Sequence, residues 1–535
     1  MNIVLQLRRR SVDSIRRFTV PFLISILLFA DLAYLTCWPS DEKWPVYGAI
    51  SLCIAAMFSV WWQLVLEARR ITGTKAWLWQ GASLVVWAGS YGTWMAVQDM
   101  TYIILYGSGI FLALTAGILA WLTYYAGESA FNRVFCGALQ AVGVAVVADI
   151  SLSICAMALQ TLLQLSLSFS NLYALIFYAS FLVVGWNVFL SSVPKVGCPA
   201  LPSKPFGTVM AYVVVPVYGV LLAILYIYIA MIFFKGEMPV GKMNWFASIA
   251  LLVYAFCYLT CSGYDKHAWL LRCYRRWGGL LLLPVVAVQL WGVYIRHEAY
   301  GLTELRYLSM ACTAFGIAVI PAALRRLSGT WLFLLAAGMT LIISVTPLNV
   351  LDTPYRSQEK RLLAMMEEKG MLQNGVVSDA ADLSHEDKEE LYSTYRYVKS
   401  YTGQRDPAVE AVLQSPVMES LRYAGPHYRS RYFINDSTAA PVAGYATMYV
   451  VERTAGKDGM LTVQTQRGDV TISLLPYAEQ LCRQYEGAGQ MANRNVANLY
   501  LLPDDGHYLF IRTMNVDLAD DVVQSISISA ILLEK

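Results

Sequence analysis

The segment FTVPFLISILLFADLAYLTCW, residues 18–38, decides the fold class, because it is long enough to cross a bilayer and carries one charged side chain, Asp31. A transmembrane helix needs about 20 mostly apolar residues. Similar runs, separated by short charged loops, continue to about Thr346. Five arginines precede the segment and no small-residue cleavage pattern follows it. We therefore expect an uncleaved first span rather than a signal peptide.

Apolar runs of this length predict eleven membrane helices. The chain is 57% hydrophobic and 14% charged, which lies outside the range of soluble domains. Backbone in lipid must satisfy its own hydrogen bonds, so the runs should be helices, and no alternating pattern of a membrane barrel competes. The predicted spans are 18–38, 45–66, 76–97, 101–125, 134–160, 170–192, 208–234, 243–262, 278–295, 305–324 and 330–346.

The charges of the loops predict the orientation of these spans. With the N-terminus in the cytoplasm, the inner segments carry 17 Lys and Arg residues and the outer loops carry 5. Lys and Arg are enriched in cytoplasmic loops. Eleven spans then place the C-terminal part outside the cytoplasm, whereas one helix more or fewer would reverse this.

After Leu348 the chain becomes polar, and its pattern predicts a soluble α+β domain behind an all-α membrane bundle. The net charge is +10 up to Thr346 and −7 after it. An acidic domain has no electrostatic reason to bind nucleic acid. We divide the chain into a polytopic transmembrane domain, a helical juxtamembrane segment and a strand-rich α+β extracytoplasmic domain, at residues 1–350, 351–430 and 431–535.

Local signals place elements in the C-terminal part. Gly370 is a plausible end for a first helix, and Ser384-His-Glu-Asp387 has the spacing of a capping box that opens a second one. Asp504-Asp505-Gly506 is a turn signal between two strands. The expected strands are 447–452, 461–465, 470–475, 499–502, 508–514 and 522–533, with a helix at 477–485.

Two carboxyl groups lie well inside predicted spans, and they are candidate functional residues because burying charge in lipid is costly. Asp149 follows Gly137, Ala141 and Ala145 in steps of four, a stripe of small residues that should face another helix. Asp31 lies in the outer third of its span, close enough to the surface to pair with an outer-loop cation. For both, we weigh a proton or cation relay against a structural hydrogen-bonding role, and favour the structural role.

Few other patterns indicate chemistry. Pro216 and Pro284 predict kinked helices, which occur in transporter sites and in membrane helices generally. Cys257 and Cys261 are one helical turn apart, a spacing that matches no standard zinc site. The chain has no metalloprotease, nucleophile-elbow or nucleotide-binding pattern. We therefore predict no catalytic, cofactor-binding or metal-binding residues.

The most distinctive segment, YIRHEAYGLTELRY at residues 294–307, joins the ninth and tenth predicted spans. Together with the segments 216–228 and 356–362, it resembles the bacterial multi-pass membrane family catalogued as domain of unknown function 4153. The resemblance covers about residues 201–383. It implies a bacterial cytoplasmic-membrane protein and supports the predicted topology, but it supplies no activity.

This loop predicts a group of charges at the outer interface. The candidate cluster consists of Arg296, Glu298, Tyr300, Glu304 and Arg306. Glu304 is placed to pair with either arginine. We weigh a charge-paired loop that fixes two helices and docks the C-terminal part against a ligand site, and favour the first.

Three functions stay open. We favour an envelope sensor or scaffold of the bacterial inner membrane, because the predicted outer domain is large and the cytoplasmic mass is small. The alternative is a transporter or channel that uses Asp149 and the kinked helices, and the third is a membrane-embedded envelope enzyme. The expected partners are the lipid bilayer and an envelope protein bound by the C-terminal domain. No nucleic acid and no cofactor is expected.

Overall fold

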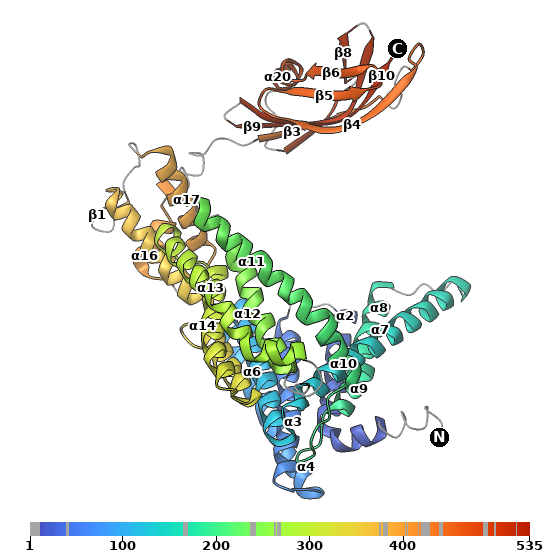
Figure 1. The fold of residues 1–535 in the computed structure, drawn as a ribbon, viewed down its shortest axis with the longest axis vertical. Helices are drawn as coiled ribbons and strands as arrows, with labels where there is room; N and C mark the ends of the chain where they lie inside the picture. Colours follow the sequence, from blue (N-terminus) through green and yellow to red (C-terminus); the bar gives the residue numbers. More distant parts are fainter. Residues whose placement is uncertain are drawn as a thin grey trace. The chain divides into compact units, whose positions relative to one another are not determined.

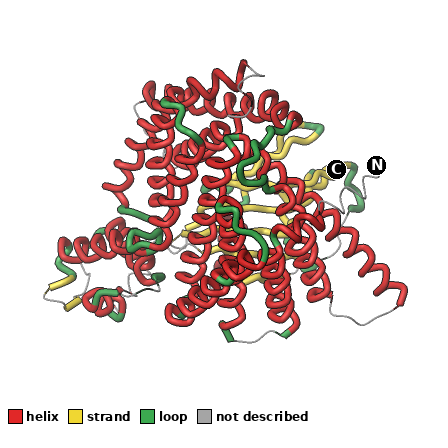
Figure 2. The backbone as a smooth tube through the Cα atoms, turned by 90° about the horizontal axis from the view of Figure 1, so that it is seen from below, coloured by secondary structure: helices red, strands yellow, loops and turns green. Residues whose placement is uncertain are grey.

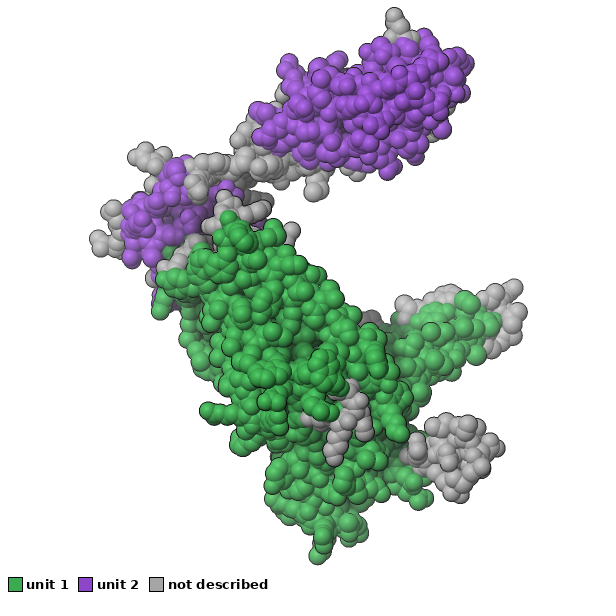
Figure 3. Space-filling model, in the orientation of Figure 1, with its two compact units in different colours: residues 1–361, 400–404 green, residues 362–399, 405–535 purple. Residues whose placement is uncertain are grey.

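The structure, a computed structural model, forms two compact units (Figure 3). Unit 1 comprises Met1–Arg361 and Ser400–Gln404, and unit 2 comprises Leu362–Lys399 and Arg405–Lys535. The chain therefore passes between the units three times. The described residues are 11–535 except 39–41, 164–168, 236–241, 262–263, 265–268, 374–375, 378–382, 402, 404, 416, 419–428, 438–441, 485–490, 497–498, 505 and 520–521.

Unit 1 is helical (Figures 1 and 2). Among the described residues, eight helices are long and apolar enough to cross a membrane, and Trp245–Cys261 and Gly329–Val345 are shorter apolar helices. Each predicted span contains helix, which confirms a multi-span membrane bundle followed by a sheet-containing domain. The elements are α2 (Thr19–Cys37), α3 (Trp44–Ala68), α4 (Thr74–Gln80), α5 (Ala82–Val97), α6 (Met100–Ala126), α7 (Ser129–Leu163), α8 (Phe169–Tyr178), η1 (Ala179–Gly185), α9 (Trp186–Ser192), α10 (Lys204–Val209), η2 (Met210–Val214), α11 (Val215–Lys235), α12 (Lys242–Cys261), α13 (Trp269–Tyr300), α14 (Glu304–Leu324), α15 (Gly329–Val345) and α16 (Asp352–Glu368).

Three predicted spans are not continuous α-helices. The third is divided at Gly81, where α4 ends and α5 begins. The sixth and seventh contain the π-helical segments η1 and η2. Pro216 follows η2 by two residues, and its missing N–H removes one i→i−4 bond, which favours the wider π-turn at this point. Pro284, by contrast, lies inside the continuous helix α13.

Small residues allow the helices of unit 1 to approach closely. A Cβ atom added to Gly109 on α6 would lie 1.9 Å from the hydroxyl oxygen of Ser344 on α15. Gly137 on α7 stands in the same relation, also at 1.9 Å, to Ser192 on α9. Lipid tails are as apolar as the helices, so van der Waals packing of this kind is what holds membrane helices together.

An ion pair fixes the start of the bundle. Arg17 donates to both carboxylate oxygens of Glu67 at 2.7 and 2.8 Å, and to the carbonyls of Val193 and Pro194 at 2.7 and 3.0 Å. Both side chains are mostly buried, with 17% and 22% of their surface exposed. A bidentate pair with further carbonyl partners fixes direction as well as distance. Arg17 thereby joins the chain before α2 to the end of α3 and to the segment after α9.

Unit 2 contains short helices and a six-stranded sheet. The strand order is β4-β10-β9-β3-β7, and β8 pairs with β9. Neighbouring strands are antiparallel except β3 and β7, which are parallel. The elements are α17 (His385–Lys399), α18 (Pro407–Leu413), α20 (Leu475–Gln484), β1 (Leu372–Gln373), β2 (Val376–Val377), β3 (Arg429–Asn435), β4 (Thr447–Ala455), β5 (Met460–Thr465), β6 (Gly468–Ser473), β7 (Met491–Val496), β8 (Tyr500–Asp504), β9 (His507–Ala519) and β10 (Val522–Glu534).

One face of this sheet carries the core of unit 2. The β5–β6 hairpin and α20 lie over that face (Figure 1). Side chains alternate along β9 and β10, and those on this face are buried, among them Ile511, Met514, Ile528 and Leu532. Cys482 on α20 belongs to the same core. The predicted hairpin around Gly506 is present as β8 and β9.

We predict that Gly109→Ala lowers the free energy of unfolding of the full chain in detergent by about 1–3 kcal/mol, because the new methyl group overlaps Ser344. The melting temperature should fall accordingly. The double variant with Ser344→Gly removes the overlap and should recover most of the loss. Gly338→Ala on α15 is the matched control, since a Cβ atom there meets nothing within 4 Å. Equal melting temperatures for Gly109→Ala and Gly338→Ala would contradict this packing.

Candidate functional site

Asp31 faces the neighbouring helix rather than an identified cation. A Cβ atom at Gly48 on α3 would lie 3.1 Å from its Oδ2 atom. That oxygen is buried and has no hydrogen-bond partner among the described residues. The absence of a side chain at Gly48 therefore provides the space that the carboxyl group of Asp31 occupies.

Asp149 lies one turn beyond the small-residue stripe of α7. Ala141 and Ala145 in this stripe are buried, and a Cβ atom at Gly185 on η1 would lie 3.1 Å from the Cβ of Ala145. The stripe therefore packs on η1 and α9, whereas Asp149 is partly exposed. Figure 1 shows α7 and α8 extending side by side from the rest of unit 1.

The predicted outer cluster is described only in part. Arg296, Glu298 and Tyr300 lie in α13, but their side chains are outside the described residues. Glu304 is the first residue of α14 and is exposed. Arg306 donates to the carbonyl of Gly301 at 2.7 Å, which closes the turn between α13 and α14.

This turn is bound to the start of α16. Gln358 donates to the carbonyl of Leu302 at 2.9 Å, and the N–H of Leu302 donates to the hydroxyl of Ser357 at 3.3 Å. Gly301 has a φ of +65°, and a Cβ atom there would lie 2.8 Å from the amide nitrogen of Gln358. The turn therefore needs glycine at this position both for its backbone and for its contact. Two segments that carry the family resemblance, 294–307 and 356–362, thus meet in space.

The first residue of α16 is held by a group of polar side chains, which we call the Asp352 cluster. Oδ1 of Asp352 accepts from the hydroxyls of Tyr102 at 2.5 Å and Tyr401 at 2.6 Å, and Oδ2 accepts from the side chain of Asn349 at 2.7 Å. The side chain of Asn349 also accepts from the N–H groups of Leu351 and Asp352. The cluster therefore caps α16 and links it to α6.

Tyr401 brings a distant part of the chain into this cluster. Its ring stacks on Tyr355 with the centroids 3.7 Å apart. Burial, and then the hydrogen bond to Asp352, raise the pKa of Tyr401 to about 12. The hydroxyl therefore stays protonated and donates to the carboxyl group. All of these contacts lie within unit 1, since residues 400–404 belong to it.

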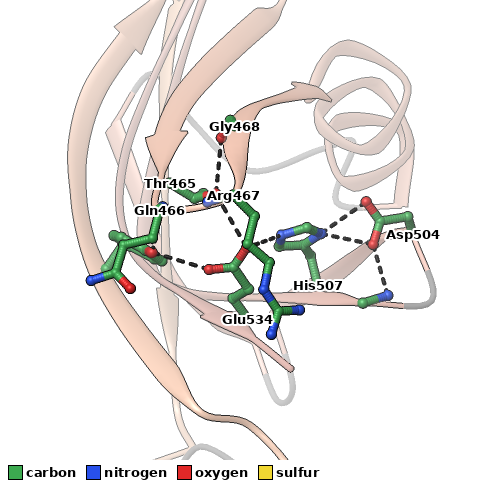
Figure 4. A network of polar contacts seen from close by, with 9 residues as sticks. Thr465, Gln466, Arg467, Gly468, Asp504, His507 and Glu534 are labelled. Atoms are coloured by element: carbon green, nitrogen blue, oxygen red, sulfur yellow. Dashed lines mark hydrogen bonds and ion pairs between the residues drawn. The ribbon is translucent and has the colours of Figure 1, made fainter.

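A second polar network lies at one end of the core of unit 2, and Figure 4 shows it around Glu534. Glu534 is only 3% exposed. Its Oε2 accepts from Tyr449 at 3.0 Å, and its Oε1 accepts from Thr465 at 3.2 Å and lies 3.4 Å from Nε2 of His507. Nδ1 of His507 is 2.8 Å from Asp504. The network therefore joins β4, the β5–β6 turn and the β8–β9 turn to the end of β10.

The electrostatics of this network favour charged carboxylates. Hydrogen bonding to His507 holds the pKa of Asp504 below its ordinary value of 3.8. Burial acts to raise the pKa of Glu534, but the hydrogen bonds from Tyr449 and Thr465 and the adjacent His507 outweigh it and hold that pKa below 4.5. The arrangement positions two carboxylates on either side of one imidazole and fixes the end of the sheet.

The face of the sheet opposite the core has a different character. Residues paired directly across neighbouring strands share a face, so Tyr508, Leu533 and Met448 lie in one row, and Phe510, Ile531 and Val450 in the next. We call the exposed part of this surface the tyrosine face. It is formed by Tyr445, Met448, Val450, Tyr500 and Tyr508.

The tyrosine face is apolar and accessible. Met448 is 59% exposed, Val450 is 70% exposed and Tyr500 is 42% exposed. Tyr500 stacks on Tyr508 with the ring centroids 5.4 Å apart. Apolar surface with tyrosine is typical of protein interfaces. Within the described residues, no group of three His, Cys, Asp or Glu could hold a metal ion.

We predict that Tyr102→Phe lowers the thermal stability of the full chain in detergent, because it removes one of the hydrogen bonds to Asp352. The expected loss is about 1.5–3 kcal/mol, as for a hydrogen bond to a charged group. Tyr106→Phe is the matched control one turn along α6. If both variants have the same melting temperature as the original protein, the hydrogen bond from Tyr102 to Asp352 does not stabilise the start of α16.

We predict that acid destabilises unit 2 through Glu534 and Asp504. Both pKa values are lower in the folded state than the ordinary 4.5 and 3.8, so the stabilisation is complete above about pH 4.5 and is lost as the pH falls through the folded-state values. In calorimetric scans of the full chain, the stability of unit 2 should decrease less steeply with falling pH in Glu534→Gln than in the original protein. Glu479→Gln on the exposed face of α20 should leave it unchanged, and equal acid profiles for the two variants would refute the assignment.

A family model described as "Domain of unknown function (DUF4153)" matches residues 23–383. No match was found to a curated protein or to a solved structure. The matched segment runs from within α2 past α16 and contains the Gly301 turn and Asp352. It ends before the six-stranded sheet, so the tyrosine face and the Glu534 network lie outside it. Because the model matches well over half of the 535 residues, the chain belongs to the DUF4153 family.

Proposed function

We propose that this membrane protein is a sensor or scaffold of the bacterial cell envelope. In this proposal it is anchored in the inner membrane, and its C-terminal domain lies outside the cytoplasm and binds an envelope protein. The observation that carries the proposal is α16, one helix that belongs to both units of the chain.

Helix α16 is suited to connect the two units mechanically. Asp352 and Gln358 at its start are hydrogen-bonded within unit 1. Leu362 and Met366, which are fully buried, lie in the part that belongs to unit 2. An α-helix is held by continuous i→i−4 hydrogen bonds, so a displacement at one end is passed to the other. A partner that moves the end of α16 would therefore act on the Asp352 cluster.

The loop charges support the proposed orientation. The split of 17 to 5 Lys and Arg residues favours a cytoplasmic N-terminus. Counting α4 with α5 as one crossing, and α12 and α15 as one each, gives an odd number of crossings. The C-terminal domain is then on the outer side.

The tyrosine face is the surface that we assign to the partner. It combines exposed apolar side chains with tyrosine rings, which supply large contact area at low entropic cost. It also adjoins β4, which ends the strand order of the sheet. An edge strand of this kind can pair with a strand of another chain.

We predict that a photoreactive amino acid placed at Val450 cross-links in cells to one envelope protein of defined mass. The same residue placed at Glu479 on α20 is the control, because α20 covers the opposite face of the sheet. Val450→Asp should weaken capture at a second photoreactive site, Met448, at least five-fold. Identical products at positions 450 and 479, or none at either 450 or 448, would contradict the proposed binding face.

Transport is the second candidate function, and three hydrogen-bonded polar side chains inside unit 1 favour it. Gln289 on α13 is fully buried and donates to Ser248 on α12 at 2.9 Å and to Ser309 on α14 at 3.3 Å. Buried polar groups in membrane helices often mark substrate paths, although they also join helices. Unchanged solute flux in vesicles after Gln289→Leu and Asp149→Asn would eliminate this candidate.

A further inference from the structure

A lateral groove lies between α3, α6 and α15, inside unit 1. Its volume is about 520 Å³, which is within the range of about 300–1,000 Å³ found for ligand pockets. None of the described residues that line it carries a charge. Small side chains hollow out the groove, and they come from both α6 and α15, namely Ala113, Gly117, Ala120 and Ala337.

Aromatic rings form a continuous wall along the groove. The ring centroids of Trp61 and Trp121 are 6.3 Å apart, those of Trp121 and Tyr125 are 4.8 Å apart, and those of Tyr125 and Tyr124 are 4.9 Å apart. Tyr124, at the end of this series, is 72% exposed. Tyrosine and tryptophan favour the boundary between hydrocarbon and headgroups. The series of rings therefore runs from the apolar part of the groove to its polar end.

Two arginines precede the helix that closes one end of the groove. Thr330 lines the groove in the first turn of α15. Arg325 and Arg326 lie just before that turn, in the short connection from α14. Both are exposed, and among the described residues neither guanidinium group makes a hydrogen bond or ion pair. Two free guanidinium groups at a membrane boundary are complementary to phosphate.

We propose that this groove binds one acyl chain of an anionic phospholipid, with the phosphate held by Arg325 and Arg326. Lipid is the medium that surrounds a membrane helix bundle, so an acyl chain reaches a lateral groove directly. The apolar lining suits the chain, and the arginines select a negative headgroup. The site is separate from the tyrosine face, and the proposal does not depend on the proposed sensor function.

Gly117 allows the groove to be filled with little disturbance. A Cβ atom there meets nothing within 4 Å, so a leucine side chain can enter the space that the acyl chain would occupy. Gly338 on α15 is equally open and does not line the groove. Both changes replace a helical glycine by leucine and thus alter helix propensity equally. Gly338→Leu is therefore the matched control for Gly117→Leu.

The test uses the full chain in nanodiscs that contain phosphatidylglycerol with a photoreactive acyl chain. We expect labelled peptides from 110–125 and 330–341, a loss of at least five-fold with Gly117→Leu, and no loss with Gly338→Leu. Ala337→Phe is a second filling variant, and size-exclusion profiles check that each variant is folded. Equal labelling in Gly117→Leu, Ala337→Phe and Gly338→Leu would overturn the site.

The arginines are tested by competition between headgroups. Unlabelled phosphatidylglycerol should displace the photoreactive lipid several-fold better than phosphatidylcholine does. In the double variant Arg325→Gln, Arg326→Gln this preference should disappear while the labelled peptides stay the same. A preference that survives in the double variant, or one that is absent from the original protein, would refute the assigned headgroup.

Discussion

Two tyrosine hydroxyls and one side-chain amide donate to Asp352, and these hydrogen bonds fix the start of the helix that leaves the membrane unit. The donors come from α6, from the turn before α16 and from Tyr401. Three distant parts of the chain therefore meet at one carboxyl group. Gln358 adds a second attachment, six residues along α16, to the turn between α13 and α14. A helix attached at two points cannot rotate freely, so its direction is set by unit 1.

The two units are stabilised by different interactions, and α16 contributes residues to both units. In unit 1 the surroundings are lipid, so the helices gain little from burying apolar surface against each other. They rely instead on close contacts such as Gly109 with Ser344, and on the Arg17–Glu67 pair. Unit 2 has a conventional core between the sheet, α20 and the β5–β6 hairpin, which burial of apolar surface stabilises in water.

Local signals made much of this fold predictable. The length of an apolar run is a property of consecutive residues, so every membrane helix was expected close to its position. The Ser384 cap of the predicted capping box is present, with the N–H of Asp387 donating to the hydroxyl of Ser384 at 3.2 Å. The stripe of Gly137 and Ala145 likewise packs on a neighbouring helix. The loop 294–307 was expected to dock the C-terminal part through paired charges; its Leu302 binds the start of α16, while the charge pairing stays a prediction.

Features that depend on distant residues were not predictable from one sequence. Tyr102 and Asp352 are 250 positions apart, and neither has a local pattern that points to the other. The parallel pairing of β3 with β7, and the tyrosine face, follow from strand register, which the alternation of residues alone does not set. For Asp31 a structural role was favoured over a relay, but the space that Gly48 leaves for it on α3 could not be read from the sequence.

The most direct test of the connection through α16 is hydrogen exchange of the full chain in detergent, compared between the original protein and the double variant Tyr102→Phe, Tyr401→Phe. Faster exchange should extend through α16 past Arg361 into residues 362–368, while the strands β9 and β10 keep their protection. Exchange that stays unchanged in α16, or that rises only before Arg361, would show that the helix does not connect the two units.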